Sequence, residues 1–405
     1  MTLALEGIRV LDWTIWQQGP IGTALLGDLG AEVIKLEALE GDPGRGLVRL
    51  SGMGLAERPN FYIEANNRNK KSLALDLKKP EAREIVHELV KRADVFAQNF
   101  RVGVAERLGL DYETLRDHNP RLIYAHATGF GPKGPEAAVA AMDQMGIARS
   151  GLMLAVGEPD APPQQIAGGI ADQMSGIMLA WGVLAALVAR ERHGMGQKVD
   201  VSQLGSMALL QGLNLSARLM LGTAIPRVRR SESANPLWNH YRCADGLWLV
   251  LGMAQGERHW AAFCRALGAP EIEGLWSGAR ASAASGDAAA TAAVAALDER
   301  FASRPRAEWL AQLRAASADF IVAPVNRLED LPDDPQVRAN EYVTEFDHPQ
   351  HGPTRMVGFP VGLSATPASI RAAAPELGQH TEEVLQELLG YDWERIGHLR
   401  ARGVI

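Results

Sequence analysis

The chain has 405 residues and a net charge of −7, with 47% hydrophobic and 22% charged residues, which is ordinary for a globular protein of one elaborated domain or two. The acidic balance gives no overall attraction for nucleic acid or an acidic membrane surface, although it leaves room for a local basic pocket. The two cysteines, Cys243 and Cys264, have no metal-type spacing and predict no disulfide scaffold. The N-terminus resembles no targeting peptide, so we expect a cytoplasmic protein.

The first third of the chain alternates strand and helix signals. "IRVLDW", "AEVIKLE", "DVFAQNF" and "RLIYAHAT" are typical of strands, whereas "GPIGTALLGDLG" and "KPEAREIVHELVKRA" are typical of helices. This rhythm predicts an α/β fold, with an open, mostly parallel, Rossmann-like sheet covered by helices.

Residues 171–193 predict one long helix, "QKVDVS" a strand and "QLGSMALLQGLNLSARLML" a further helix. The apolar stretch Ile177–Ala189 has 13 residues, and because a membrane span needs about 20, we expect a core helix and no membrane contact. "YRCADGLWLVLGM" indicates a hairpin, and the alanine-rich residues 280–300 a surface helix or loop. We expect a large domain over 1–225 and 329–405, with a smaller α+β domain over 226–328.

Most catalytic motifs are absent. No zinc-binding pattern, G-x-S-x-G elbow or P-loop occurs, so no metal is expected. "GFGPKG" (Gly129–Gly134) matches the dinucleotide pattern, but Pro132 opposes a helix there, which favours a tight turn over a nicotinamide site. Hydride transfer therefore remains a distant alternative.

A carboxylate, Asp172, stands where the apolar helix begins, after Gly168 and Gly169. It has two interpretations, a structural helix cap or a carboxylate nucleophile that backbone amides keep ionised. Asp143 lies in a second mostly apolar segment and raises the same alternatives. Basic residues gather in two further stretches, 66–79 and 99–109, either as solvated loops or as phosphate contacts beside strand ends.

These segments, nearly continuous over the first 200 residues, together resemble the family III CoA-transferases of the CaiB/BaiF type, which include formyl-CoA:oxalate and carnitine CoA-transferases. The segments are "LEGIRVLDWTIWQQGPIGTALLGDLGAEVIKLE", "GDPGR", "NRNKKSLALDLK", "ADVFAQNFRVGVAERLGLDYETL", "NPRLIYAHATGFGPKGP" and "DQMSGIMLAWGVLAALVARERHGMGQKVDVS". The resemblance implies that Asp172 is the nucleophile, that CoA moves from an acyl-CoA donor to a free carboxylic acid, and that the enzyme passes through an aspartyl mixed anhydride and an aspartyl-CoA thioester.

The resemblance also implies roles for other residues. Gln17 matches a glutamine near the anhydride, and Asp143 an acidic residue facing the same site. The residues that match the CoA pocket are Leu75, Lys78, Asn99, Phe100, Arg101 and Arg107. Ala38 and Ala140 stand where some members carry Arg and Lys, so part of the phosphate contact must come from elsewhere or be weaker.

Two alternatives remain within the same fold. α-Methylacyl-CoA racemases place a histidine directly before the second aspartate, but this chain has Met142 there, and a thioether is no general base. A non-catalytic subunit of a heteromeric transferase would have no need of Asp172. The resemblance implies an acyl-CoA and a carboxylate as substrates, no permanently bound cofactor, and an interlocked homodimer or a heteromer with a paralogous subunit. The two acids stay open, although dicarboxylates such as succinate are plausible donors.

Overall fold

A computed structural model describes residues 2–49, 60–277 and 288–405. The chain forms two compact units, one of residues 1–153, 165–223 and 336–405, the other of 154–164 and 224–335. The second unit contains the expected small domain, 226–328, together with residues 154–164, 224–225 and 329–335, which were expected in the large domain. The domain bounds stay a prediction.

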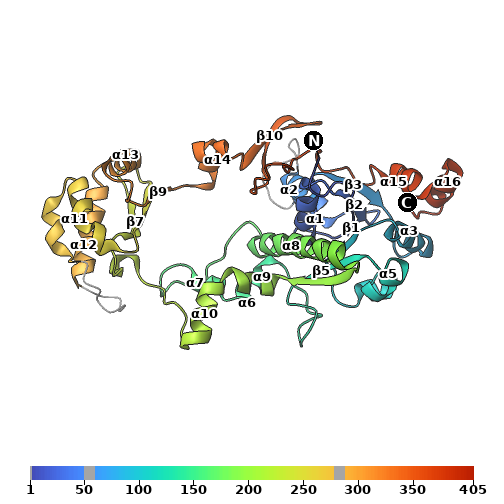
Figure 1. Cartoon of the computed structure of the whole chain (residues 1–405), viewed down its shortest axis with the longest axis horizontal. Helices are drawn as coiled ribbons and strands as arrows, with labels where there is room; N and C mark the ends of the chain where they lie inside the picture. Colours follow the sequence, from blue (N-terminus) through green and yellow to red (C-terminus); the bar gives the residue numbers. More distant parts are fainter. Residues whose placement is uncertain (1, 50–59, 278–287) are drawn as a thin grey trace. The chain divides into compact units, whose positions relative to one another are not determined.

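The first unit is built on a six-stranded parallel sheet of order β3-β2-β1-β4-β5-β6 (Figure 1). The strands are β1 (Arg9–Trp13), β2 (Glu32–Glu37), β3 (Lys70–Ala74), β4 (Val95–Gln98), β5 (Ile123–Thr128) and β6 (Gln197–Ser202). Every pairing is parallel, which confirms the expected fold class. Strand order reverses between β1 and β4, and in open α/β sheets ligands bind beyond the carboxyl ends of the strands at such a point.

Helices cover both faces of this sheet because side chains alternate along each strand. On one face Leu11 and Phe96 pack against α3 (Pro80–Val90), α5 (Tyr112–His118) and the C-terminal α15 (Thr381–Leu389) and α16 (Trp393–Ala401). On the other face Val10 and Val95 pack with α1 (Gln18–Asp28) and α8 (Ile170–His193). Helices α1 and α8 run side by side (Figure 1).

The remaining elements of the first unit are short. The helices are α2 (Phe61–Asn67), α4 (Val104–Leu108), α6 (Asp143–Arg149), α9 (Gln203–Leu210) and α10 (Gly212–Leu221), and the hairpin is β10 (Val343–His348) with β11 (Gly352–Val357). Two short helices, α7 (Leu152–Ala155) and α14 (Pro335–Ala339), lie where the chain passes from one unit to the other.

The second unit packs helices on an antiparallel sheet of order β7-β8-β9. Its elements are β7 (Trp238–Arg242), β8 (Trp248–Gly252), β9 (Val322–Val325), α11 (Gly256–Ala266), α12 (Ala288–Phe301) and α13 (Arg306–Ala316). The expected hairpin is β7–β8. Residues 280–287 of the alanine-rich stretch lie outside the described residues, whereas α12 buries Val294, Leu297 and Phe301 in a core that also holds Trp260 and Trp309.

Helix α8 is the one described helix that is long and apolar enough to cross a membrane, judged by length and composition alone. Core helices of globular proteins pass the same test, and α8 packs Leu179, Val183 and Leu187 against the sheet. Packing therefore explains part of its apolar composition, whereas Ile177, Trp181 and Val188 remain exposed.

Candidate active site

A cavity of about 560 Å³ opens at the carboxyl ends of β1, β4 and β5, where the strand order reverses. Its size is in the range of small-molecule sites. Segments that directly follow the three strands supply most of its wall. The lining residues are Ile15, Trp16, Gln18, Tyr62, Asn99, Phe100, Arg101, Val102, Val104, Arg107, Thr128, Gly129, Ala137, Ala138, Val139, Ala141, Met142, Asp172 and Gln203.

Asp172 lies in the first turn of α8 and lines this cavity. The side chain is half-buried, and its Oδ1 accepts a hydrogen bond of 2.5 Å from Gln203 Nε2. Burial raises the pKa of Asp172 to about 6, the Asp143 charge adds to the rise, and the Gln203 hydrogen bond opposes it. The carboxylate therefore needs little energy to change its charge state near neutral pH.

The cap of α8 comes from a different aspartate than expected. Among the described residues, the one hydrogen bond of the Asp172 carboxylate comes from Gln203 Nε2, and none comes from the backbone amides that were expected to hold it. Instead Asp143 Oδ1, from the start of α6, accepts from the backbone amides of Ala171 at 2.7 Å and of Asp172 at 3.1 Å. Asp143 thus satisfies the exposed amides of α8 and leaves the Asp172 carboxylate free to face the cavity.

Sequence analysis missed Gln203. This residue begins α9 directly after β6, and its side chain is buried, with 3% of its surface exposed. Among the described residues, its Oε1 has no hydrogen-bond partner. A polar residue at the carboxyl end of a parallel strand was a signal available in "VDVSQ", by the same rule that drew attention to residues 99–101.

Gln17 lies against the start of α8. Its Nε2 donates at 3.5 Å to Gly168 O and at 3.4 Å to Gly169 O, and these long bonds leave the amide only weakly held. Gly169 has φ of +70°, and a Cβ there would lie 2.2 Å from Gln17 Oε1. Glycine is therefore required for this approach. Gln17 itself does not line the cavity, although its neighbours Trp16 and Gln18 do.

A buried ionic cluster holds the loop between β1 and α1, which carries Trp16 and Gln17. Lys35 Nζ donates to Thr14 O at 2.8 Å and to Asp42 Oδ2 at 2.9 Å. Asp42 Oδ1 in turn accepts from the Trp16 amide at 3.2 Å. Trp16 has φ of +64°, a left-handed conformation that bulky residues rarely adopt, so surrounding bonds must hold it.

Asp12 completes this cluster. Its Oδ2 accepts from Lys70 Nζ and from Thr23 Oγ1, both at 2.8 Å, and its side chain is fully buried. Burial alone would raise the pKa of Asp12, but the charges of Lys70 and Lys35 outweigh that effect and lower it.

The residues expected in the CoA pocket divide between two adjoining cavities. Asn99, Phe100, Arg101 and Arg107 line the first cavity, whereas Leu75 and Lys78 line a second of about 400 Å³. Both are lined by Ile15, Phe100 and Val104.

The side-chain amide of Asn99 is already engaged. It donates to Ile15 O at 2.8 Å and accepts from Ile15 N at 2.9 Å. Asn99 therefore ties the β1–α1 loop to the end of β4, and its hydrogen-bonding capacity is largely used within the protein.

The cations of the two cavities are few. Arg101 and Arg107 are exposed at the first, and Lys78 is the one Lys or Arg among the described lining residues of the second. Ala38, one of the two positions where the resemblance implied a basic residue in some family members, lines the second cavity and places only a methyl group there.

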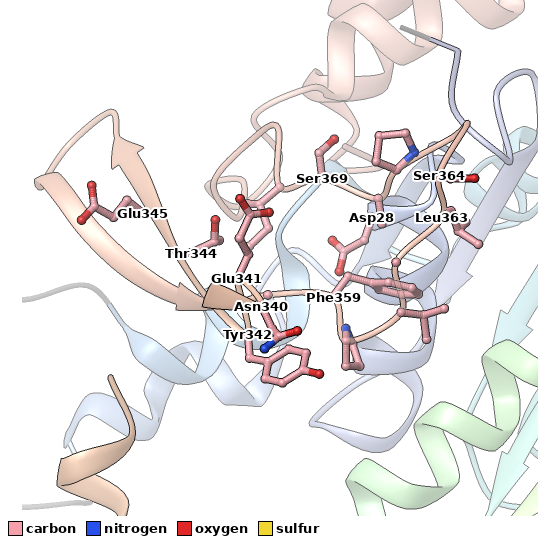
Figure 2. A pocket seen from close by; sticks show the side chains of 17 residues that line it. Asp28, Asn340, Glu341, Tyr342, Thr344, Glu345, Phe359, Leu363, Ser364 and Ser369 are labelled. Atoms are coloured by element: carbon pink, nitrogen blue, oxygen red, sulfur yellow. The ribbon is translucent and has the colours of Figure 1, made fainter. Parts of the chain in front are cut away.

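A further cavity, of about 660 Å³, lies between the end of α1 and the C-terminal segments (Figure 2). Its side chains include Asp28, Glu341 and Glu345, and none of the lining residues that the structure describes is Lys or Arg. Because a polyphosphate needs cations, this cavity fits CoA less well than the second cavity, which has Lys78 beside its own four carboxylates, Glu37, Glu40, Asp42 and Asp76.

An open parallel sheet with a carboxylate-bearing cavity at the strand-order reversal is an architecture of small-molecule enzymes. Residues 5–381 match the model of CoA-transferase family III. The chain is 34% identical to a formyl-CoA:oxalate CoA-transferase of Streptomyces avermitilis over the whole of both chains. It is 33% identical to a succinyl-CoA:mesaconate CoA-transferase of Haloarcula hispanica, over 95% of this chain and 96% of that one.

A crystal structure of a CaiB/BaiF family protein from Brucella suis superposes with a TM-score of 0.80 and 29% identity, over 96% of this chain and all of the other. The chain belongs to the family III CoA-transferases and is an enzyme of the transferase class. Within the described residues, no group of three or more His, Cys, Asp and Glu side chains could hold a metal ion.

Proposed function

We propose that this protein transfers CoA from an acyl-CoA donor to a free carboxylic acid, with Asp172 as the covalent carboxylate. Asp172 attacks the donor thioester to give a mixed anhydride and free CoA thiolate, which then forms an aspartyl-CoA thioester. The acceptor acid takes the acyl-activated position through a second anhydride. Each step exchanges one activated carboxylate for another, so the protein mainly has to position groups and exclude water.

The observation that carries this proposal is the position of Asp172. It is a half-buried carboxylate at the wall of a cavity, with Oδ1 bound to Gln203 and, among the described residues, no partner on Oδ2. A partly desolvated carboxylate without a neighbouring cation is a better nucleophile than one fixed in an ion pair. Asp143 supports it indirectly by capping α8, and Gln17 donates to the carbonyl oxygen of Gly169, three residues before Asp172.

We assign CoA to the two adjoining cavities. Arg101, Arg107 and Lys78 supply cations for its phosphates, and Leu75 and Phe100 supply apolar surface for the adenine and the pantetheine arm. Asn99 contributes by fixing the loop that carries Trp16. The acyl group and the acceptor acid then occupy the part of the first cavity beside Trp16 and Asp172.

The proposal is tested by trapping the enzyme-bound acyl group. Wild-type enzyme mixed with succinyl-CoA or formyl-CoA and quenched with hydroxylamine should carry a hydroxamate at Asp172, located by peptide mass spectrometry. Asp172→Asn should lower turnover at least about a thousandfold and give no adduct. Asp117→Asn, which alters an exposed aspartate on α5, is the matched control and should behave as wild type. Full activity of Asp172→Asn would remove the proposal.

Racemisation of a 2-methylacyl-CoA is the second candidate. Met142 lines the cavity with more than half of its surface exposed, and its thioether cannot remove an α-proton. Incubation with a 2-methylacyl-CoA in deuterated water should therefore leave the α-carbon free of deuterium. Rapid exchange would favour the racemase.

We further propose a dimer, interlocked as in the resembled family and formed with a second copy or a paralogous chain. Helix α10 exposes Leu213, Leu219, Met220 and Leu221, each with at least 76% of its surface exposed, and α8 exposes Trp181. Several large apolar side chains exposed on one short helix support association with another chain. Sedimentation should show a dimer, and a compact monomer at micromolar concentration would contradict it.

A further inference from the structure

The two oxygens of Asp172 have different surroundings. Oδ1 lies 2.5 Å from Gln203 Nε2, a short bond to a charged acceptor. Oδ2 has no described partner and is the oxygen available for attack on a substrate. The difference matters because, in the proposed reaction, the carboxyl carbon of Asp172 is itself attacked.

We propose that Gln203 Nε2 is the hydrogen-bond donor that stabilises the oxyanion formed on Asp172 Oδ1 whenever a nucleophile adds to the Asp172 carboxyl carbon. This inference rests on the proposed function and assigns Gln203 to particular steps within it. Gln203 touches the reacting group directly and is in this sense a catalytic residue.

The bonds made and broken show which steps are affected. In the first step Oδ2 bonds to the donor acyl carbon, the C–S bond breaks, and its electron pair leaves on CoA thiolate. The negative charge of that transition state develops on the donor's oxygen, not on Oδ1. In the second step the thiolate adds to the Asp172 carboxyl carbon, and the π-electron pair moves onto Oδ1. The intermediate then collapses, the bond to Oδ2 breaks, and the donor acid leaves as a carboxylate that carries that oxygen.

The acceptor half of the reaction mirrors this. In the third step an oxygen of the acceptor carboxylate adds to the Asp172 carboxyl carbon, Oδ1 again takes the charge, and the thiolate is expelled. In the fourth step the thiolate attacks the acceptor acyl carbon, and the bond that breaks returns a carboxylate to Asp172. Gln203 therefore acts on the second and third steps and leaves the first and fourth to other donors.

The structure holds the Gln203 amide ready for this role. Its side chain is 3% exposed, and Gly146 of α6 makes room for it, since a Cβ on Gly146 would lie 2.8 Å from the Gln203 Cβ. Among the described residues, Oε1 of Gln203 has no hydrogen-bond partner. The orientation of the amide is therefore decided by Asp172 alone. Turning the amide over would place Oε1 against the Asp172 carboxylate, and the repulsion keeps the N–H group there. A buried donor that is already aimed at the oxygen need not reorganise as charge develops.

Two partial reactions separate the affected steps from the others, with succinyl-CoA and formyl-CoA as probes and no acceptor present. Incorporation of labelled free CoA into the donor thioester requires only the first step and its reversal. The burst of free donor acid requires the second step. Both are measured at pH 8.5, where Asp172 is ionised with or without Gln203, so that a changed pKa does not contribute.

Gln203→Met removes the donor and keeps the length of the side chain, and Gln203→Asn withdraws the donor by one carbon as a second variant with different packing. In each we expect the acid burst to slow about 10²- to 10³-fold, as for loss of one oxyanion donor, while CoA incorporation changes less than about threefold. Gln211→Leu is the matched control. That glutamine, eight residues further along, donates to Ser150 O at 3.0 Å and lies outside both cavities, so both rates should stay unchanged.

If the Gln203 variants slow both partial reactions equally, the assignment is overturned. It is also overturned if they slow neither reaction. Absence of both reactions in the wild type would instead count against the proposed function, so the two failures are distinguishable.

Discussion

Two aspartates of this protein are buried close to the same loop, and their environments lead to opposite behaviour. Asp12 lies beneath the loop between β1 and α1, bonded to Lys70 and near Lys35, and its pKa falls below the usual range. Asp172 lies at the cavity wall beside an amide and a second carboxylate, and its pKa rises to about 6. Burial acts in the same direction on both, so the neighbouring charges decide the difference.

The comparison separates two uses of a buried carboxylate. At Asp12 the charge is neutralised by lysines and fixes the loop that carries Trp16 and Gln17. At Asp172 the charge is left without a cation among the described residues, which costs folding free energy and leaves Oδ2 available for the proposed attack. Replacing each by asparagine removes the same charge, and the two substitutions should change stability with opposite signs.

The largest effect is expected for Asp12→Asn. It removes the one ion-pair partner that Lys70 has among the described residues, and breaking a buried ion pair from one side costs about 3–5 kcal/mol. Urea unfolding at pH 7 should show this loss. Glu113→Gln, which breaks the exposed pair with Arg116, is the control and should change the unfolding free energy by less than about 1 kcal/mol. If Asp12→Asn changed the unfolding free energy as little as this control, the contrast between Asp12 and Asp172 would be wrong.

Asp172→Asn should instead stabilise the protein. The pKa is raised from 3.8 to about 6, and at 1.36 kcal/mol per unit, reduced because the group is only partly buried, ionisation costs about 2 kcal/mol of folding free energy. The sign follows from the raised folded pKa, since the cost is fully present above pH 6 and disappears below the unfolded pKa. Unfolding free energies should therefore favour the variant at pH 8, and its advantage should shrink towards pH 4. An unstable variant at pH 8 would contradict this.

The pH dependence of activity tests the raised pKa of Asp172 in a second way. Because Asp172 must be ionised to act as the proposed nucleophile, kcat/KM should fall about tenfold between pH 7 and pH 5, with an inflection near pH 6. Asp143→Asn removes a charge that raises the pKa of Asp172, while its side-chain oxygen can still accept from the α8 amides, so the inflection should move to lower pH. An inflection that stays in place would show that Asp143 acts only through its cap.

The sheet and its covering helices were predictable because strand and helix periods are local properties of the sequence. The same is true of Asp172, which stands at a visible boundary between flexible glycines and an apolar helix. Its surroundings were not predictable in this way. Gln203 and Asp143 reach Asp172 and its backbone from 31 and 29 residues away, and only the packing of α6, α8 and α9 brings them together.

The cap of α8 shows most clearly what could not be predicted from the sequence. An aspartate near a helix start predicts a cap, and α8 does have an aspartate cap, but the residue comes from a neighbouring helix. The ionic cluster gives a second example. Asp12 and Lys35 lie opposite each other on adjacent strands, yet Asp12 forms its ion pair with Lys70 and Lys35 with Asp42. The sequence predicted which type of residue would form a cap or an ion pair. Which residue it would bind depended on the tertiary structure.

The uncompensated charge at Asp172 also has an evolutionary consequence. If the gene were duplicated and one copy were released from selection for turnover, the protein from that copy would gain folding stability by losing this one carboxylate. Substitution of Asp172 would therefore be favoured in that copy. Under the proposed function, a copy of this protein that keeps Asp172 would be expected to be under continued selection for turnover, because the carboxylate lowers folding stability.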